Sequence, residues 1–197
     1  EQAVKHCTQG IGIWEWASND CGEEPDIVMA SCGDTPTLEV MAAVTILRDA
    51  MPELKVRVVN VVDLFKMQSD HKHPHGLSDA EYDAIFTKDK PVIFAFHGYP
   101  TLIHELTFER NNHNMSVHGY LEEGTITTPF DMRVQNQIDR FNLVKDAVMH
   151  LPQLGNKGSF LIQQMNDKLV AHKQYIAEYG QDLEEVRDWE WHTPEDK

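Results

Sequence analysis

The feature that most constrains this sequence is a helix-forming segment held between two runs of β-branched and small apolar residues. The first run is Asp26–Ser31 and the second is Lys55–Val62. Between them, Pro36–Met51 carries apolar residues at helical spacing, and Pro52 ends the helix. A strand, a helix and a strand in so short a stretch predict a βαβ unit, with parallel strands and a right-handed crossover.

The helix between the two runs has a clear start signal. Thr35 is a good N-cap residue, and Pro36 suits the first helical position. We therefore expect the helix to begin at Pro36 and to place one set of side chains on a common side: Leu38, Met41, Ala42, Thr45, Ile46 and Ala50.

The same alternation continues through most of the chain. Two further strands are expected at Pro91–Phe96 and Ser116–Leu121. Helices are expected over five ranges, the first with a capping box: Ser78–Phe86, Thr101–Asn111, Pro129–Gln137, Asp139–Leu151 and Ser159–Tyr179. Because the strands are apolar on both faces, we expect an α/β fold. Its sheet is open and mostly parallel, has four to five strands flanked by helices, and is followed by extra C-terminal helices.

The chain of 197 residues is long enough for one such domain with additional helices. Residues 1–22 are expected to form a leading helix, over Glu1–Asp20, and a linker. Residues 23–151 make the sheet domain, and residues 152–197 a helix and an acidic tail packed on the same domain. The missing initiator Met, and a start inside an apparent helix, suggest a segment of a longer chain or a processed product.

The charge balance limits the partners. Net charge is −15, from 32 acidic against 17 basic residues, which disfavours a nucleic-acid partner. No apolar stretch approaches the ~18 residues that a membrane span needs, so no membrane partner is expected. The three cysteines have no CxxC spacing, which signals neither a disulfide framework nor a zinc site. A reducing cytoplasm is the expected location.

Three loops are expected at the carboxyl ends of the strands, where open α/β sheets bind ligands: Cys32–Thr35, Asp63–Gln68 and His97–Pro100. The first is a poor phosphate loop, because it has one Gly and because Asp34 would repel an anion. His97 is the best single position for function. A histidine hydrogen-bonded for structure, or placed at an interface, explains it equally well.

The loop His71–His75 brings three imidazoles within five residues. They could bind zinc, yet no further ligand stands at fixed spacing and Lys72 opposes a cation. A solvated loop is the favoured interpretation, and a metal-binding protein stays open as an alternative.

Two groups of charged residues remain, and neither indicates a reaction. The first group is Glu105, Glu109 and Arg110, and ion pairing on the surface of a helix explains it. An interface or a structural network explains the second group, which is Asp131, Arg133, Asp139 and Arg140.

Several segments together resemble phosphoketolases. Two segments are similar to C-terminal domains across the transketolase superfamily: Pro25–Glu39 and Lys55–Gln68. Three others are typical of phosphoketolases: Phe96–His104, Gly119–Met132 and Asp139–Phe141. The resemblance covers nearly the whole chain and is least distinctive after Leu151. His118 departs from it, since a basic Arg is expected there, which puts an anion-binding role at this position in doubt.

The resemblance implies an enzyme that cleaves xylulose 5-phosphate, fructose 6-phosphate or both with phosphate, giving acetyl phosphate, an aldose phosphate and water. It also implies three α/β domains. The two preceding domains of the same polypeptide hold thiamine diphosphate and magnesium, so no catalytic, cofactor or metal residue is expected on this chain. This third domain, with a fold like the transketolase C-terminal domain, is expected to support them and a homodimer, and to be inactive alone.

Interface candidates follow from the same resemblance: His97, Tyr99, Thr127, Thr128, Asp131 and Arg133. They lie in the loops His97–Pro100 and Thr125–Arg133. The alternative function is an independent regulatory module that binds a small molecule or nucleotide in the crevice at the strand ends.

Overall fold

The structure is a computed structural model that describes residues 1–121 and 126–192. Thr125, where one predicted interface loop begins, and the end of the predicted acidic tail, residues 193–197, lie outside this range. Five strands form one sheet in the order β1-β3-β2-β4-β5. Their bounds are β1 Ile11–Ile13, β2 Ile27–Cys32, β3 Val56–Val61, β4 Val92–Phe96 and β5 Met115–Gly119.

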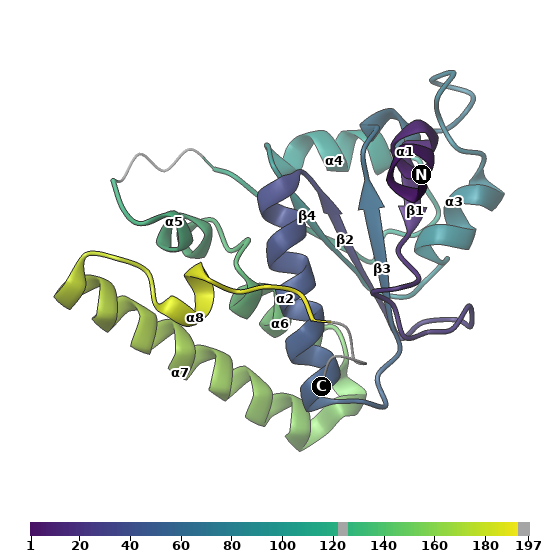
Figure 1. Cartoon of the computed structure of the whole chain (residues 1–197). Helices are drawn as coiled ribbons and strands as arrows, with labels where there is room; N and C mark the ends of the chain where they lie inside the picture. The colour runs from purple at the N-terminus through teal and green to yellow at the C-terminus, as the bar shows by residue number, and fades with distance from the viewer. Residues whose placement is uncertain (122–125, 193–197) are drawn as a thin grey trace.

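The sheet is open and mostly parallel, as predicted (Figure 1). β2 pairs in parallel with β3 from Ile27 opposite Val56, and with β4 from Val28 opposite Val92. β5 continues the parallel part beside β4. Helix α2 (Asp34–Ala50) connects β2 to β3, which confirms the predicted βαβ unit.

The N-terminal segment differs from the prediction of one helix over Glu1–Asp20. Helix α1 (Gln2–Gln9) ends at Gly10, whose φ of 79° lies in the left-handed region that glycine adopts without strain. The carbonyl of Gly10 then accepts hydrogen bonds from the N–H groups of Val62 and Asp63. That contact sets the chain antiparallel to β3, so the residues after Gly10 form strand β1.

The start of α2 also differs from the prediction. Gly33 is the N-cap residue, and the helix begins at Asp34 rather than Pro36, so Thr35 is in its first turn. The φ of 106° at Gly33 lets the chain turn directly at the end of β2. The capping box of Ser78 and Glu81 is present as predicted.

Five of the remaining helices fall close to their predicted ranges, and the last, after Tyr179, was not predicted. They are α3 Asp79–Phe86, α4 Pro100–Thr107, α5 Pro129–Gln135, α6 Arg140–Met149, α7 Gly155–Tyr179 and α8 Glu184–Arg187, with 3₁₀ turns at Leu64–Met67 and Pro152–Leu154. Among the residues that the structure describes, no helix is long and apolar enough to cross a membrane.

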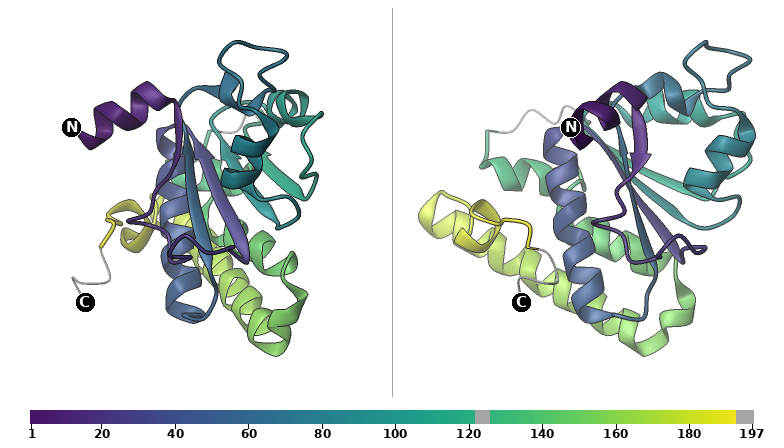
Figure 2. Two further views of the ribbon diagram at one scale, coloured as in Figure 1. Left: turned by 90° about the vertical axis from the view of Figure 1, so that its right-hand side faces the viewer. Right: turned by 45° about the vertical axis from the view of Figure 1, so that its right-hand side comes forward.

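The sheet is covered on both faces. One core cluster joins alternate strand residues such as Met29 and Val58 to α2, α6 and α7. The other joins their neighbours, such as Ala30 and Val59, to α3 and α4. Figure 2 shows the two helix layers on opposite sides of the strands.

The predicted buried side of α2 is only partly right. Leu38 and Ala50 are exposed, whereas Val40, Val44 and Leu47 are fully buried. The reason is that α2 packs against both the sheet and α6, so most of its circumference is covered.

The C-terminal segment returns over the helical layer. α7 runs along α6, and the chain then turns back through α8 (Figure 1). Val186 of α8 is buried in the core beside α2, and Trp189 and Trp191 pack against the same cluster.

Candidate interface at the carboxyl edge of the sheet

The carboxyl ends of β2 and β4 bring Asp34 and His97 together. Nδ1 of His97 lies 3.1 Å from Oδ1 of Asp34. The approach requires Gly33, because a Cβ there would lie 2.5 Å from the Cβ of His97. The backbone N–H of Thr35, and then the imidazole of His97, hold the pKa of the Asp34 carboxyl below its ordinary value.

Tyr99 lies on the rim of this edge, next to the end of β5. It is the N-cap residue of α4, and it is about half exposed. A Cβ on Gly119 would lie 2.2 Å from the carbonyl oxygen of Gly98, and the N–H of Tyr120 donates to that oxygen over 3.1 Å. The ring of Tyr120 lies 5.1 Å from the ring of His97, and burial raises the pKa of the Tyr120 hydroxyl.

Thr127, Thr128 and Asp131 form one hydrogen-bonded group at the start of α5. The Thr128 hydroxyl accepts from the N–H of Asp131 at 3.4 Å, and the Thr127 hydroxyl donates to Oδ2 of Asp131 at 2.5 Å. Gln135 donates to the same oxygen at 3.0 Å, and Lys173 of α7 lies 3.3 Å away. Burial alone would raise the pKa of Asp131, but these donors outweigh it and the pKa is lowered.

Arg133 belongs to a second group, built around a buried carboxylate that the sequence did not single out. Glu39 of α2 is fully buried. Its Oε1 accepts from Nη1 of Arg133 at 2.6 Å and from Nη2 of Arg140 at 3.1 Å. Its Oε2 accepts from the backbone N–H and from Nε of Arg140, each at 2.9 Å. The Arg140 guanidinium also lies 5.5 Å from the ring centre of Phe130 and 5.2 Å from that of Trp189.

Glu39 therefore joins α2, α5, α6 and the C-terminal segment. Both of its oxygens are satisfied, so the carboxylate is built to hold structure rather than to move a proton. The position of Glu39 carries a sequence signal: it shares a helical stripe with Ala43 and Leu47, which are in the core. An acid on a core-facing stripe predicts a buried ionic partner.

Asp139 completes this region as the N-cap residue of α6. It accepts from the N–H groups of Phe141 at 3.0 Å and Asn142 at 3.1 Å. Burial raises its pKa. In the group Asp131, Arg133, Asp139 and Arg140, the two aspartates therefore stabilise the first turns of α5 and α6. The two arginines pair with Glu39.

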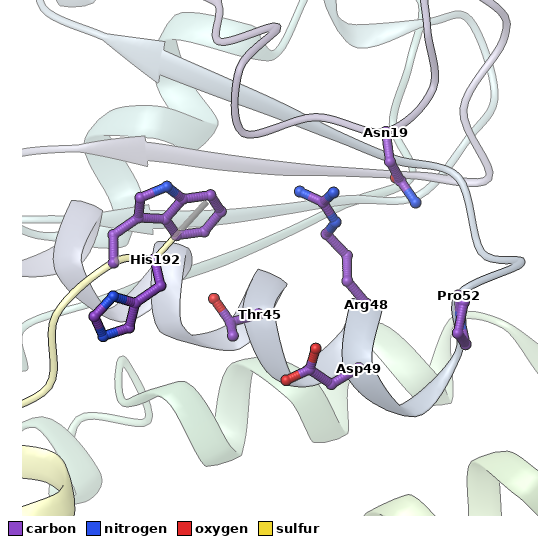
Figure 3. Close-up of a pocket in the computed structure, with 7 residues that line it drawn as sticks. Asn19, Thr45, Arg48, Asp49, Pro52 and His192 are labelled. Atoms are coloured by element: carbon purple, nitrogen blue, oxygen red, sulfur yellow. The ribbon is translucent and has the colours of Figure 1, made fainter. Parts of the chain in front are cut away.

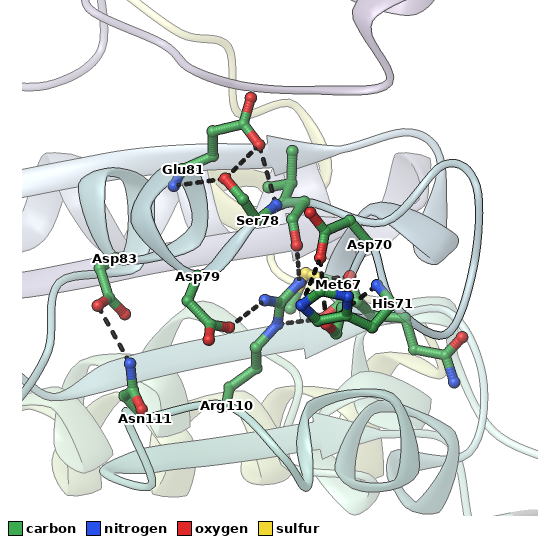
Figure 4. Close-up of polar contacts among 12 residues, drawn as sticks. Met67, Asp70, His71, Ser78, Asp79, Glu81, Asp83, Arg110 and Asn111 are labelled. Carbon is green, nitrogen blue, oxygen red and sulfur yellow. Dashed lines mark hydrogen bonds and ion pairs between the residues drawn. The ribbon is translucent and has the colours of Figure 1, made fainter.

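Arg110 is not part of a helix surface, contrary to the prediction. α4 ends at Thr107, and Arg110 is 2% exposed. Its guanidinium donates to the carbonyl oxygens of Met67, Gln68 and Leu77 and pairs with Asp79 at 2.9 Å (Figure 4). Arg110 thereby closes the base of the loop that contains the histidines, a role that local sequence does not indicate.

The three imidazoles of that loop have different polar or aromatic neighbours, and the rings of His73 and His75 also meet edge-on at 5.1 Å. His73 stacks on Phe65 with ring centres 4.0 Å apart, and His75 Nδ1 lies 2.7 Å from Oδ2 of Asp63. His71 faces Asp70 at 3.7 Å. Over residues 1–121 and 126–192, no three His, Cys, Asp or Glu side chains are placed to hold one metal ion.

His118 is largely buried against α6. Its Nε2 lies 2.6 Å from Oδ2 of Asp146, and His150 approaches Oδ1 of the same carboxylate at 3.5 Å. Burial alone would raise the pKa of Asp146, but hydrogen bonds from His118 and Ser116 outweigh it and the pKa is lowered. His118, where the resemblance predicts an Arg, is therefore already paired with an acid.

A surface pocket lies away from this edge, between the second half of α2 and the C-terminal segment. Thr45, Arg48 and Asp49 line it from α2, and His192 closes one side (Figure 3). Arg48 donates to the carbonyl oxygen of Ala17 at 3.1 Å.

The loop after β2 does not suit thiamine diphosphate. The loop after β2 has a single glycine, and Asp34 puts a carboxylate with a lowered pKa at the N-terminus of α2. An anionic diphosphate would be repelled there, and the metal that accompanies it has no cluster of acidic ligands among those residues.

Comparison with known proteins decides the family. The family described as the XFP C-terminal domain matches residues 1–191. The chain belongs to this family. A probable phosphoketolase of Clostridium acetobutylicum is 68% identical over 193 residues, which are 98% of this chain and 24% of that protein. One from Gloeobacter violaceus is 62% identical over 192 residues, 97% of this chain and 24% of that protein.

The domain thus spans about a quarter of the length of these curated relatives. A solved structure, transketolase from Leishmania mexicana, matches with a TM-score of 0.52 and 15% identity. The match covers 77% of this chain and 19% of that one, and it supports the fold alone. The predicted family and fold class are therefore confirmed. The interface role of the six candidate residues stays a prediction.

Proposed function

We propose that this domain is a non-catalytic structural and assembly part of a phosphoketolase. The observation that carries the proposal is the Glu39 carboxylate, which two arginines satisfy at the edge where α/β enzymes usually place ligands. Charged groups that neutralise each other hold elements together and have little capacity left for a substrate.

The complete enzyme would cleave xylulose 5-phosphate, fructose 6-phosphate or both with phosphate, to give acetyl phosphate, an aldose phosphate and water. Thiamine diphosphate and magnesium would be held by the two preceding domains of the same polypeptide. The enzyme would be a homodimer in the cytoplasm, and this domain would be inactive alone. The full-chain match to phosphoketolases supports the assignment, since the relatives carry most of their length outside this domain.

The contact surface would be the rim around His97 and Tyr99 together with the start of α5. Large apolar side chains are exposed on the segments that follow β4 and β5, among them Tyr99, Leu102 and Leu121. Exposed apolar groups gathered on adjoining segments are typical of interfaces. Thr127, Thr128, Asp131 and Arg133 would hold α5 in place beside them.

The test is substitution in the full-length enzyme. We expect Tyr99→Ser and Asp131→Asn to raise the dimer dissociation constant about tenfold or more, which corresponds to 1.4 kcal/mol. Tyr179→Ser is the matched control, because Tyr179 is similarly exposed but lies at the end of α7. It should leave dissociation unchanged.

Turnover separates an assembly role from a catalytic one. If the domain only assembles the enzyme, turnover per assembled dimer should return to normal at high protein concentration. Unchanged dissociation and turnover in both variants would refute the interface. A loss of turnover that persists in assembled dimers would refute the non-catalytic role.

The second candidate function is a regulatory module that binds a small molecule. The pocket beside Arg48 favours it, because Thr45 and Arg48 bring polar side chains to a surface cavity next to Trp191. Calorimetric titration with phosphate, sugar phosphates, nucleotides and acetyl-CoA tests it. Micromolar binding would support this module, and no binding would remove it.

A further inference from the structure

Helix α1 has no buried residue, although it is regular and closed by a glycine C-cap. Val4 is 70% exposed, and Cys7 is exposed one turn further on. Figure 2 shows the helix projecting away from the sheet, with its N-terminus far from the other elements.

The helix is attached at one end only. Gly10 fixes its last turn to β3, and His6 Nε2 lies 2.8 Å from Oδ1 of Asn60. Ala3, Val4 and Cys7 lie at spacings of three and four, so they share one face, and none of them is covered by the described residues. An eight-residue helix is marginal in water by itself, because most helical stability comes from packing of an apolar face.

A run of rings extends this surface beyond the helix. The ring of His6 lies 5.8 Å from that of Trp14, which lies 5.1 Å from that of Trp16. Trp16 is 54% exposed and contacts Trp191 edge-on at 5.6 Å. An exposed tryptophan held by two others is a typical anchor of an interface.

We propose that the Ala3–Val4–Cys7 face of α1 and the Trp16 ring together form a docking surface for the preceding part of the same polypeptide. This proposal rests on the proposed function. The matched family is a C-terminal domain, and the relatives carry most of their length outside it, so the preceding chain arrives at α1. The occupant is an apolar patch on that preceding part, which covers the exposed face and completes the packing that α1 lacks.

The test uses the cysteines of the native full-length protein. Limited alkylation with N-ethylmaleimide, followed by peptide mass spectrometry, compares Cys7 with Cys21, which is exposed at the opposite edge of the sheet. We expect Cys7 to react at least about tenfold more slowly than Cys21, since labelling then requires local undocking. Equal rates would overturn the proposal.

Two valine substitutions test whether docking of α1 is what protects Cys7 from alkylation. Val4→Glu should raise the labelling rate of Cys7 to that of Cys21. Val170→Glu is the matched control, because Val170 is an exposed helical valine on α7, and it should leave Cys7 protected. Continued protection of Cys7 in Val4→Glu would also overturn the proposal.

Cross-linking identifies the occupant. An amine cross-linker applied to mixed ¹⁴N and ¹⁵N protein should join the exposed Lys5 of α1 to lysines upstream of this domain, within one isotopic species. Cross-links only between different species would show a second copy and refute the assignment. None of these measurements uses turnover or dimer dissociation, so they can fail while the proposed function stands.

Discussion

Glu39→Gln tests whether the buried carboxylate holds the helical layer together. The variant keeps the size of the side chain and removes its charge, so two guanidinium groups lose their compensation. The Arg140 side chain is 3% exposed and cannot rehydrate in place, whereas that of Arg133, at 18%, partly can. Breaking a buried pair from one side costs roughly 3–5 kcal/mol. At roughly 2–4 °C of melting temperature per kcal/mol for a domain of this size, the expected loss is about 6–20 °C.

Urea unfolding followed by tryptophan fluorescence measures the effect, and Glu53→Gln is the control. Glu53 makes an exposed pair with Lys157 at 2.8 Å, so its loss should leave the free energy of unfolding essentially unchanged. Replacing Glu39 and Arg140 together by methionine should recover part of the stability, because the buried charge leaves with its partner. A loss below about 1 kcal/mol in Glu39→Gln would refute the reasoning.

Three further predictions concern the loops and the pH response. Gly33→Ala should lower the free energy of unfolding by about 1–3 kcal/mol, measured by the same unfolding, because φ is 106° and the new Cβ would meet His97. Arg110→Ala should speed tryptic cleavage after Lys72, seen by mass spectrometry, because the base of that loop loses its clamp. The lowered pKa of Asp146 gives stability that is present above its unfolded pKa and is lost as pH falls through the folded value. Asp146→Asn should therefore flatten the acid limb of a stability–pH curve, and an unchanged limb would contradict this.

The sequence predicts the parts of this fold that local chemistry determines. The β-branched runs around α2 identify the parallel strands, because strands buried on both faces must be apolar throughout. The capping box at Ser78 locates the start of α3 within one residue, because its hydrogen bonds are made inside one turn.

The parts that the sequence misses depend on distant contacts. β1 forms because the Gly10 carbonyl meets β3, about fifty residues later in the chain. Arg110 reaches carbonyl groups of Met67 and Leu77, and no spacing rule indicates such a clamp. The sequence around Glu39 shows only an acid on a core-facing stripe. The two arginines that satisfy it lie 94 and 101 residues later in the chain.

The C-terminal segment has a consequence for how the domain is made. The Trp189 ring covers the Arg140 guanidinium, and Val186 closes the core cluster that earlier elements have already built. During translation the sheet and α2 leave the ribosome well before this segment, so the nascent domain holds a partly open apolar face until Val186 emerges. A product that stops earlier keeps that face, which chaperones and proteases recognise. The order of the elements thus links closure of this core to synthesis of the segment that contains Val186.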